Sequence, residues 1–188
     1  DKALVVPEVN GEQIDLSPRI IANPNCSTIQ MVLALAALDR AVGVDYVRVA
    51  TYQSCSGAGQ KGINALYEET RASLEGKRPQ KSAVHARTIA FDVVPQIGAF
   101  EADGFSEEEH KMMAETKKIL SRPDLRISAT CVRVPVARCH SEAVHVGLKK
   151  SLSVHEAADI LDRMPGLRVT DKTDALAYPT AIQGEGTF

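Results

Sequence analysis

The chain has 188 residues, of which 44% are hydrophobic and 24% charged, with a formal net charge of -2 at pH 7. This length and composition allow a core of ordinary size, which predicts a single domain over residues 1–188. The interspersed charges and scarce aromatic residues argue against a nucleic-acid partner, and no apolar run is long enough to span a bilayer, so we expect no membrane partner.

Strand-like and helix-like segments alternate along the chain. A short apolar, strand-like stretch at 20–22 is followed by residues 29–41, which are apolar almost all round and favour a helix buried between layers. Later strands are predicted from β-branched residues and later helices from capping patterns. We expect a strand at 44–52, a helix at about 63–74, an exposed loop at 75–82, a strand at 89–94, a helix from Ser106 to about Leu120, strands at 125–134 and 143–148, a helix opening at Ser153 and a short strand at 168–170; residues 178–188 show no usable periodicity.

Cys26 lies at the expected start of the first long helix, within the segment 23–28. A helix N-terminus carries unpaired N–H groups and a partial positive charge, which favour a thiolate over a thiol. Asn25 or Ser27 could cap the same helix without any chemistry. These residues therefore leave two readings of Cys26, a nucleophile or a small core residue beside a cap.

Four cysteines are too few for a disulfide framework, so we expect free thiols in the cytoplasm.

Residues 57–62 read Gly-x-Gly-x-x-Gly between an expected strand and an expected helix, which is the setting of a dinucleotide-binding loop. That fingerprint also needs a second parallel strand ending in an acidic residue about 20 positions later. Here that region is polar and contains Lys77, Arg78 and Lys81. We favour glycines that turn a strand into a helix, whose backbone N–H groups could still touch a cofactor held elsewhere.

Arg133 and His140 form a second chemical cluster. Strand parity would place them on opposite faces, but Pro135 cannot donate to a ladder and should interrupt the strand between them. They could then converge on one pocket, where an imidazole suits a cysteine nucleophile and a guanidinium suits a carboxylate. A solvated arginine and a structural histidine are the alternative. The histidines and cysteines show no metal-ligand spacing, so we expect no metal.

Several segments, taken together and in order, resemble the aspartate-semialdehyde dehydrogenases. They are residues 23–28, 51–57, 89–95, 114–120, 131–135 and 139–142. The resemblance covers most of the chain. Asn25 favours this family over two relatives, because the N-acetyl-glutamyl-phosphate reductases usually read Asn-Pro-Gly-Cys at the nucleophile and the glyceraldehyde-phosphate enzymes Ser-Cys-Thr-Thr.

The resemblance implies a reaction in lysine, threonine and methionine biosynthesis. Cys26 would attack L-aspartyl 4-phosphate and expel phosphate, and the thioester would be reduced with NADPH to L-aspartate 4-semialdehyde. His140 would act as general base and acid. The resemblance also implies binding roles: Gln53 orients the substrate, Arg133 binds its α-carboxylate, Glu108 its ammonium group and Lys111 the phosphate, while Ser56 and Gly57 contact NADP.

The implied fold is α+β, similar to the catalytic and dimerisation domain of glyceraldehyde-3-phosphate dehydrogenase, with a mixed β-sheet and helices packed on one face. The other face is open to a partner, so we expect a homodimer. The family's nucleotide-binding domain and C-terminal helix are absent from this sequence, so the chain by itself is expected to be inactive. A dimerisation module with an incompletely assembled pocket, or an unrelated Cys-His hydrolase that needs no nucleotide, are the alternatives.

Overall fold

A computed structural model describes residues 2–14 and 20–170, which form two compact units. The first unit contains residues 2–14, 20–49, 110–129 and 144–170, and the second contains 50–109 and 130–143. Each strand of the sheet contributes residues to both units. The tail at 178–188 lies outside the described residues.

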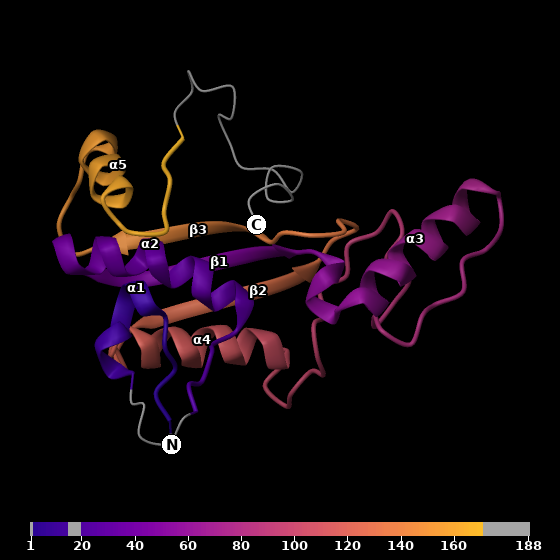
Figure 1. Cartoon of the computed structure of the whole chain (residues 1–188), viewed down its shortest axis with the longest axis horizontal. Coiled ribbons are helices and arrows are strands. Elements are labelled where there is room, and N and C mark those ends of the chain that lie inside the picture. Colours follow the sequence, from indigo (N-terminus) through magenta and orange to yellow (C-terminus); the bar gives the residue numbers. More distant parts are fainter. Residues whose placement is uncertain (1, 15–19, 171–188) are drawn as a thin grey trace. The chain divides into compact units, whose positions relative to one another are not determined.

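The described strands form one mixed sheet with β1 in the middle, as Figure 1 shows. The Val134 N–H, just after β2, donates to the Gln53 carbonyl at the end of β1 at 2.9 Å, so these strands run parallel. The Lys149 N–H, just after β3, donates to the Gly43 carbonyl just before β1 at 2.9 Å, so this pair is antiparallel. These bonds confirm the mixed sheet. The strands are β1 (Val44–Gln53), β2 (Arg126–Arg133) and β3 (Ser141–Leu148).

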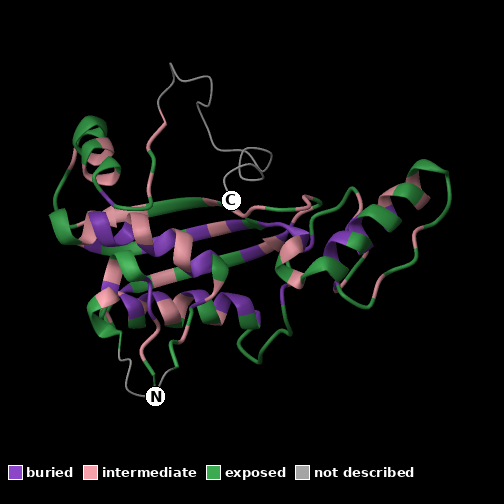
Figure 2. Cartoon of the chain, viewed as in Figure 1, coloured by how far each residue is buried: buried purple, intermediate pink, exposed green. Residues whose placement is uncertain are grey.

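The faces of β1 differ in burial. Val47 and Val49 are buried, whereas Tyr46 and Arg48 between and beside them are exposed. Because successive side chains of a strand point to opposite faces, one face of β1 is covered and the other is open. The alternating colours along the strand in Figure 2 show this pattern, and it confirms helices on one face.

The first unit is organised around α2 (Cys26–Val42), the predicted long helix. The Asn25 side chain caps it, accepting from the N–H groups of Ser27 at 2.9 Å and Thr28 at 3.2 Å. Val32 packs with side chains of α1 (Pro7–Asn10), and Ala36 and Ala37 pack with side chains of α5 (Val154–Asp162). The helix is therefore buried between neighbours, as predicted. A short 3-10 helix, η1 (Gly11–Gln13), follows α1.

Two short strands predicted in this unit do not form. Of residues 20–22, Ala22 makes a single bridge, to Leu4, and Ile20 and Ile21 are exposed. Residues 168–170 have no regular structure, because the Val169 N–H is directed to the Asp162 carboxylate at 3.5 Å instead of to a neighbouring strand. Segments of three residues are too short to hold a strand without a long partner.

The second unit contains η2 (Cys55–Ala58), α3 (Gln60–Leu74) and the beginning of α4 (Glu107–Ile119). Its core includes Cys55, Leu66, Ile89 and Val94. Residues 75–82 form a largely exposed loop, as predicted.

The predicted strand at 89–94 is wrong. The buried carboxylate of Glu69 accepts from the N–H groups of Ile89 at 2.6 Å and Ala90 at 3.2 Å, which removes donors that a strand would use. Phe91 then takes a φ of 59°, a left-handed conformation that ends any extended run. What remains is one antiparallel bridge, between Val94 and Arg133.

Glu69 therefore anchors the loop to α3, and its removal should weaken the second unit. Replacing Glu69, which is 3% exposed, with glutamine should lower the free energy of unfolding by about 1–3 kcal/mol, because buried backbone donors lose a charged acceptor. Urea denaturation measures this change. Glu68→Gln, on the exposed side of α3, is the matched control; an equal effect of both substitutions would contradict the anchoring role.

Candidate active site

Cys26 is exposed and is the first residue of α2. Its neighbour Asn25 caps the helix with its side chain, and the Asn25 N–H donates to the Glu115 carboxylate of α4 at 2.7 Å. The thiol is thus held at a helix N-terminus whose position is fixed from a second helix. An accessible thiol in this electrostatic setting suits a nucleophile.

The other thiols are less suited to attack. Cys55 and Cys131 are fully buried. Burial raises the pKa of Cys55, and it raises the pKa of Cys131 to about 12. Both therefore stay protonated and inert near neutral pH. Cys139 is partly buried and has a φ of 67°; it directly precedes His140.

Arg133 and His140 converge on one residue, Ser54, as the interruption at Pro135 suggested they could. The Arg133 guanidinium donates to the Ser54 carbonyl at 2.6 Å. The Ser54 N–H donates to Nδ1 of His140 at 3.2 Å, and the Ser54 hydroxyl lies 3.0 Å from the same nitrogen. Ser54 is fully buried. Its three contacts fix the orientation of both side chains.

The other ring nitrogen of His140, Nε2, is buried and has no hydrogen-bond partner among the described residues. Burial, and then the positive charge of Arg133, lower the pKa of His140 below its ordinary value. The ring is therefore neutral at pH 7. A neutral, oriented imidazole with an unused nitrogen suits proton transfer or hydrogen bonding to a bound group.

Gly57 lies beside this nitrogen. A Cβ atom on Gly57 would be 2.8 Å from Nη1 of Arg133 and 3.4 Å from Nε2 of His140, so any larger residue would crowd both. The local backbone also explains why the next two positions of the motif are glycine. Gly59 has a φ of 73°, and a Cβ atom on Gly62 would collide with the Cys55 carbonyl. These contacts account for the Gly-x-Gly-x-x-Gly pattern as the turn between β1 and α3.

Two further predicted residues lie near Ser54 in the chain. Gln53 is buried, and its side-chain amide donates to the Thr51 hydroxyl at 3.3 Å. The hydroxyl of Ser56 lies 2.9 Å from that of Ser54, so Ser56 extends the network that holds His140. Ser54 itself was not predicted as a site residue from the sequence. The available signal was its position inside the segment 51–57, which resembles the family.

The first turn of α4 carries Glu108, which is 7% exposed, and Lys111, which is exposed. Their spacing of three places them on one side of the helix. Glu109 is equally buried, and its carboxylate accepts from the N–H groups of Ser106 at 2.7 Å and Cys131 at 2.9 Å. A capping pattern predicted that this helix begins at Ser106, but the contact of Glu109 with β2 could not be read from that pattern.

The predicted site residues are divided between the units. Cys26 and Lys111 belong to the first. The second contains the remaining ones, Gln53, Ser56, Gly57, Glu108, Arg133 and His140. Among the described residues no group of three or more His, Cys, Asp or Glu side chains could hold a metal ion.

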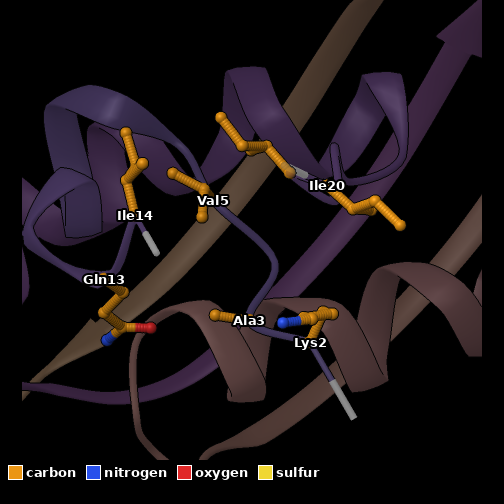
Figure 3. A pocket seen from close by; sticks show the side chains of 7 residues that line it. Lys2, Ala3, Val5, Gln13, Ile14 and Ile20 are labelled. Carbon is orange, nitrogen blue, oxygen red and sulfur yellow. The ribbon is translucent and has the colours of Figure 1, made fainter. Parts of the chain in front are cut away.

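A separate pocket in the first unit has a volume of about 180 Å³ (Figure 3). It is lined by Val5, Ile14 and Ile20 among other residues, with Lys2 as its charged side chain. It contains none of the predicted site residues. In the part of the chain that the structure describes, no helix combines the length and apolarity needed to cross a bilayer.

The effect of Arg133 on His140 can be measured directly. In an NMR titration of the chain, the pKa of His140 should lie below about 6.5. Arg133→Gln should raise it because the neighbouring positive charge is removed, whereas Arg133→Lys should raise it less. Lys77→Gln, which removes a cation paired with Glu75 in an exposed loop, is the control. An unchanged pKa in Arg133→Gln would contradict the described electrostatics.

Residues 35–187 match the family model described as semialdehyde dehydrogenase, dimerisation domain. The chain is 45% identical over 188 residues to the aspartate-semialdehyde dehydrogenase of Aquifex aeolicus, covering 99% of this chain and 55% of that protein. It is 46% identical over 185 residues to the aspartate-semialdehyde dehydrogenase of Legionella pneumophila, covering 97% of this chain and 53% of that protein. The chain spans about half the length of the curated relatives it matches.

Solved structures agree. Aspartate semialdehyde dehydrogenase II from Vibrio cholerae, determined in complex with ASA, matches with a TM-score of 0.92 and 41% identity, covering 99% of this chain and 55% of that chain. The structure of aspartate semialdehyde dehydrogenase from Candida albicans with NADP matches with a TM-score of 0.61 and 27% identity, covering 87% of this chain and 45% of that chain. The resemblance seen in the motifs and the fold it implied are confirmed. The chain belongs to the semialdehyde dehydrogenase family, whose dimerisation domain it contains.

Proposed function

We propose that this chain provides the nucleophile and the substrate-binding residues of an NADP-dependent aspartate-semialdehyde dehydrogenase. The observation that carries the proposal is the arrangement around Ser54, which holds Arg133 and the neutral ring of His140 beside the small residue Gly57. The identity to aspartate-semialdehyde dehydrogenases over nearly the whole chain supports it.

In this mechanism the thiolate of Cys26 attacks the acyl carbon of aspartyl 4-phosphate. A C–S bond forms, the C–O bond to phosphate breaks, and phosphate leaves. After reduction of the thioester, the thiohemiacetal collapses to the aldehyde and returns the thiolate. His140 holds or moves the proton at Nε2 during these steps, and Gln53 orients the acyl group.

The substrate is an α-amino acid, and two buried charges suit its two ends. Arg133 would bind the α-carboxylate, since a guanidinium recognises carboxylates through paired N–H groups. Glu108 would bind the α-ammonium group, and Lys111 would bind the phosphate. Glu108 and Arg133 are each 7% exposed, so their contacts with substrate would be weakly screened by water.

NADP supplies or accepts the hydride when it is bound. The described residues fit a part of its site: Gly57 is exposed and has no side chain beside Nε2 of His140, which suits the close approach of a flat ring. Ser56 would contact the same group. The N–H groups of both residues already donate to carbonyls of this chain, so the phosphates of NADP would be bound elsewhere.

The proposal predicts activity that depends on further sequence. Phosphate-dependent reduction of NADP with aspartate semialdehyde is measured for this chain and for an extended chain, in which the flanking segments of the Aquifex aeolicus relative are joined to it. We expect turnover by the extended chain and little by the chain itself. A folded extended chain without turnover would contradict the proposal, and ester cleavage without nucleotide would favour a hydrolase.

We also propose that the chain forms a homodimer through the open face of its sheet. In the first unit, the Tyr46 ring lies against Gly147, with the guanidinium carbons of Arg48 and Arg126 at 5.4 and 5.7 Å from its centroid. A rigid aromatic ring flanked by arginines has the composition of an interface hot spot. The printed description of the family's domain, dimerisation, supports a second copy as the partner.

Sedimentation equilibrium tests this surface. Tyr46→Ala should weaken dimerisation by about 2 kcal/mol, or ~30-fold in Kd. Tyr67→Ala, which removes an exposed tyrosine of α3, is the matched control and should leave Kd unchanged. A monomeric profile of the unaltered chain at micromolar concentration would contradict the homodimer.

A further inference from the structure

The carboxylate of Glu109 joins two elements that carry candidate substrate residues. One oxygen, Oε2, accepts from the Ser106 N–H at 2.7 Å at the start of α4. The other, Oε1, accepts from the Cys131 N–H in β2 at 2.9 Å. The first bond belongs to a capping box, which the Glu109 N–H completes by donating to the Ser106 hydroxyl at 3.5 Å. The bond to Cys131 adds nothing to the cap.

The two elements that the Glu109 carboxylate connects also carry the residues proposed to bind the amino-acid end of the substrate. Glu108 directly precedes Glu109 in α4, and Arg133 is two residues beyond Cys131 in β2. Residues two apart in a strand share a face, and both Cys131 and Arg133 are buried. Glu109 thus connects the backbone that carries the carboxylate to the backbone that carries the guanidinium.

A second connection runs through the loop before α4. The Glu108 N–H donates to the Ile97 carbonyl at 3.4 Å, and Val94 and Arg133 exchange two backbone bonds of 2.9 Å each. This loop connection is longer and includes segments without regular structure. The Glu109 carboxylate is the direct link, and a buried charged acceptor with two N–H donors is the stronger restraint.

Recognition of an α-amino acid needs a fixed separation between the two binding groups. Its ammonium and carboxylate groups are attached to one carbon, so a carboxylate and a guanidinium that drift apart cannot bind both. We infer that Glu109 is a positioning residue that sets the separation of Glu108 and Arg133, and thereby the enzyme's preference for substrates bearing both an α-ammonium and an α-carboxylate group. This inference rests on the proposed roles of Glu108 and Arg133.

Two substrates test it in the extended chain: aspartate semialdehyde and 4-oxobutanoate, the same molecule without its amino group. The measured quantity is the ratio of their kcat/KM values. Glu109→Gln keeps the size of the side chain but leaves one backbone N–H without an acceptor, and it should lower the ratio by at least about tenfold. The loss should fall mainly on KM for aspartate semialdehyde.

Glu107→Gln, on the exposed side of the same turn, is the matched control and should change the ratio by less than about twofold. Ser106→Ala weakens the cap but keeps the bond to Cys131, so it should also leave the ratio unchanged. If Glu109→Gln does not fold, Glu109→Asp, whose shorter side chain cannot reach both donors, should lower the ratio in the same way.

Equal losses for both substrates, or an unchanged ratio in a folded Glu109 variant, would overturn the inference and leave a structural role. Glu108→Gln separates this failure from failure of the proposed function. If Glu108→Gln lowers the ratio and the Glu109 variants do not, only the positioning role is wrong. If Glu108→Gln leaves the ratio unchanged, the proposed binding of the ammonium group is wrong, and the inference fails with it.

Discussion

Cys26→Ser in the extended chain is expected to reduce phosphate-dependent NADP reduction by at least about 1000-fold, because a serine hydroxyl is a far weaker nucleophile than a thiolate. The effect should appear in kcat, since the substitution leaves Arg133 and Glu108, the residues proposed to bind the substrate, unchanged. Steady-state kinetics measures it, and intact-protein mass spectrometry should show that the covalent acyl adduct is lost with the activity.

Cys139→Ser is the matched control for the nucleophile. Cys139 is the other thiol that is not fully buried, and it is adjacent to His140. This variant should retain most of the activity, because no step of the proposed mechanism uses the Cys139 sulfur. Activity that survives in Cys26→Ser and disappears in Cys139→Ser would show that the nucleophile is misassigned.

Gly57→Ala is expected to impair catalysis even though it adds one methyl group. That group would be 2.8 Å from the Arg133 guanidinium and 3.4 Å from Nε2 of His140. The arginine would have to move away from the Ser54 carbonyl, and losing a hydrogen bond of a charged group should lower kcat/KM by about 10- to 100-fold. Steady-state kinetics with aspartate semialdehyde and phosphate measures the loss.

Gly11→Ala is the control for this substitution. Gly11 has a φ of -59°, and a Cβ atom there would meet its nearest neighbour at 4.0 Å. Gly11→Ala should therefore leave kcat/KM unchanged. Full activity of Gly57→Ala would mean that Arg133 or His140 does not act from the position described.

The regular elements with strong local signals could be predicted from the sequence. The β-branched run of β1 and the Ser153 capping box of α5 are local features, and both elements form as expected. The strand at 89–94 failed because its fate depends on Glu69, a residue 20 positions earlier whose carboxylate takes the Ile89 N–H. No periodicity within the segment itself carries that information.

In the candidate site, too, local sequence features could be predicted and contacts between distant residues could not. The expected break at Pro135 left open whether Arg133 and His140 converge, and the structure brings both side chains to Ser54. Ser54 could not be singled out, because its importance comes from bonds to residues 79 and 86 positions away. The capping pattern at Ser106 predicted where α4 begins, but the bond between Glu109 and Cys131 depends on how β2 packs against α4.

The central proposal is that Cys26 is the nucleophile and His140 its general base, and the pH dependence of Cys26 alkylation tests this proposal most directly. Peptide mass spectrometry of the extended chain gives the reactive pKa of Cys26 with His140 present and in His140→Ala. We expect a value well below the free-thiol value of about 8.5, raised by the substitution. A pKa near the free-thiol value that is indifferent to His140 would contradict the account.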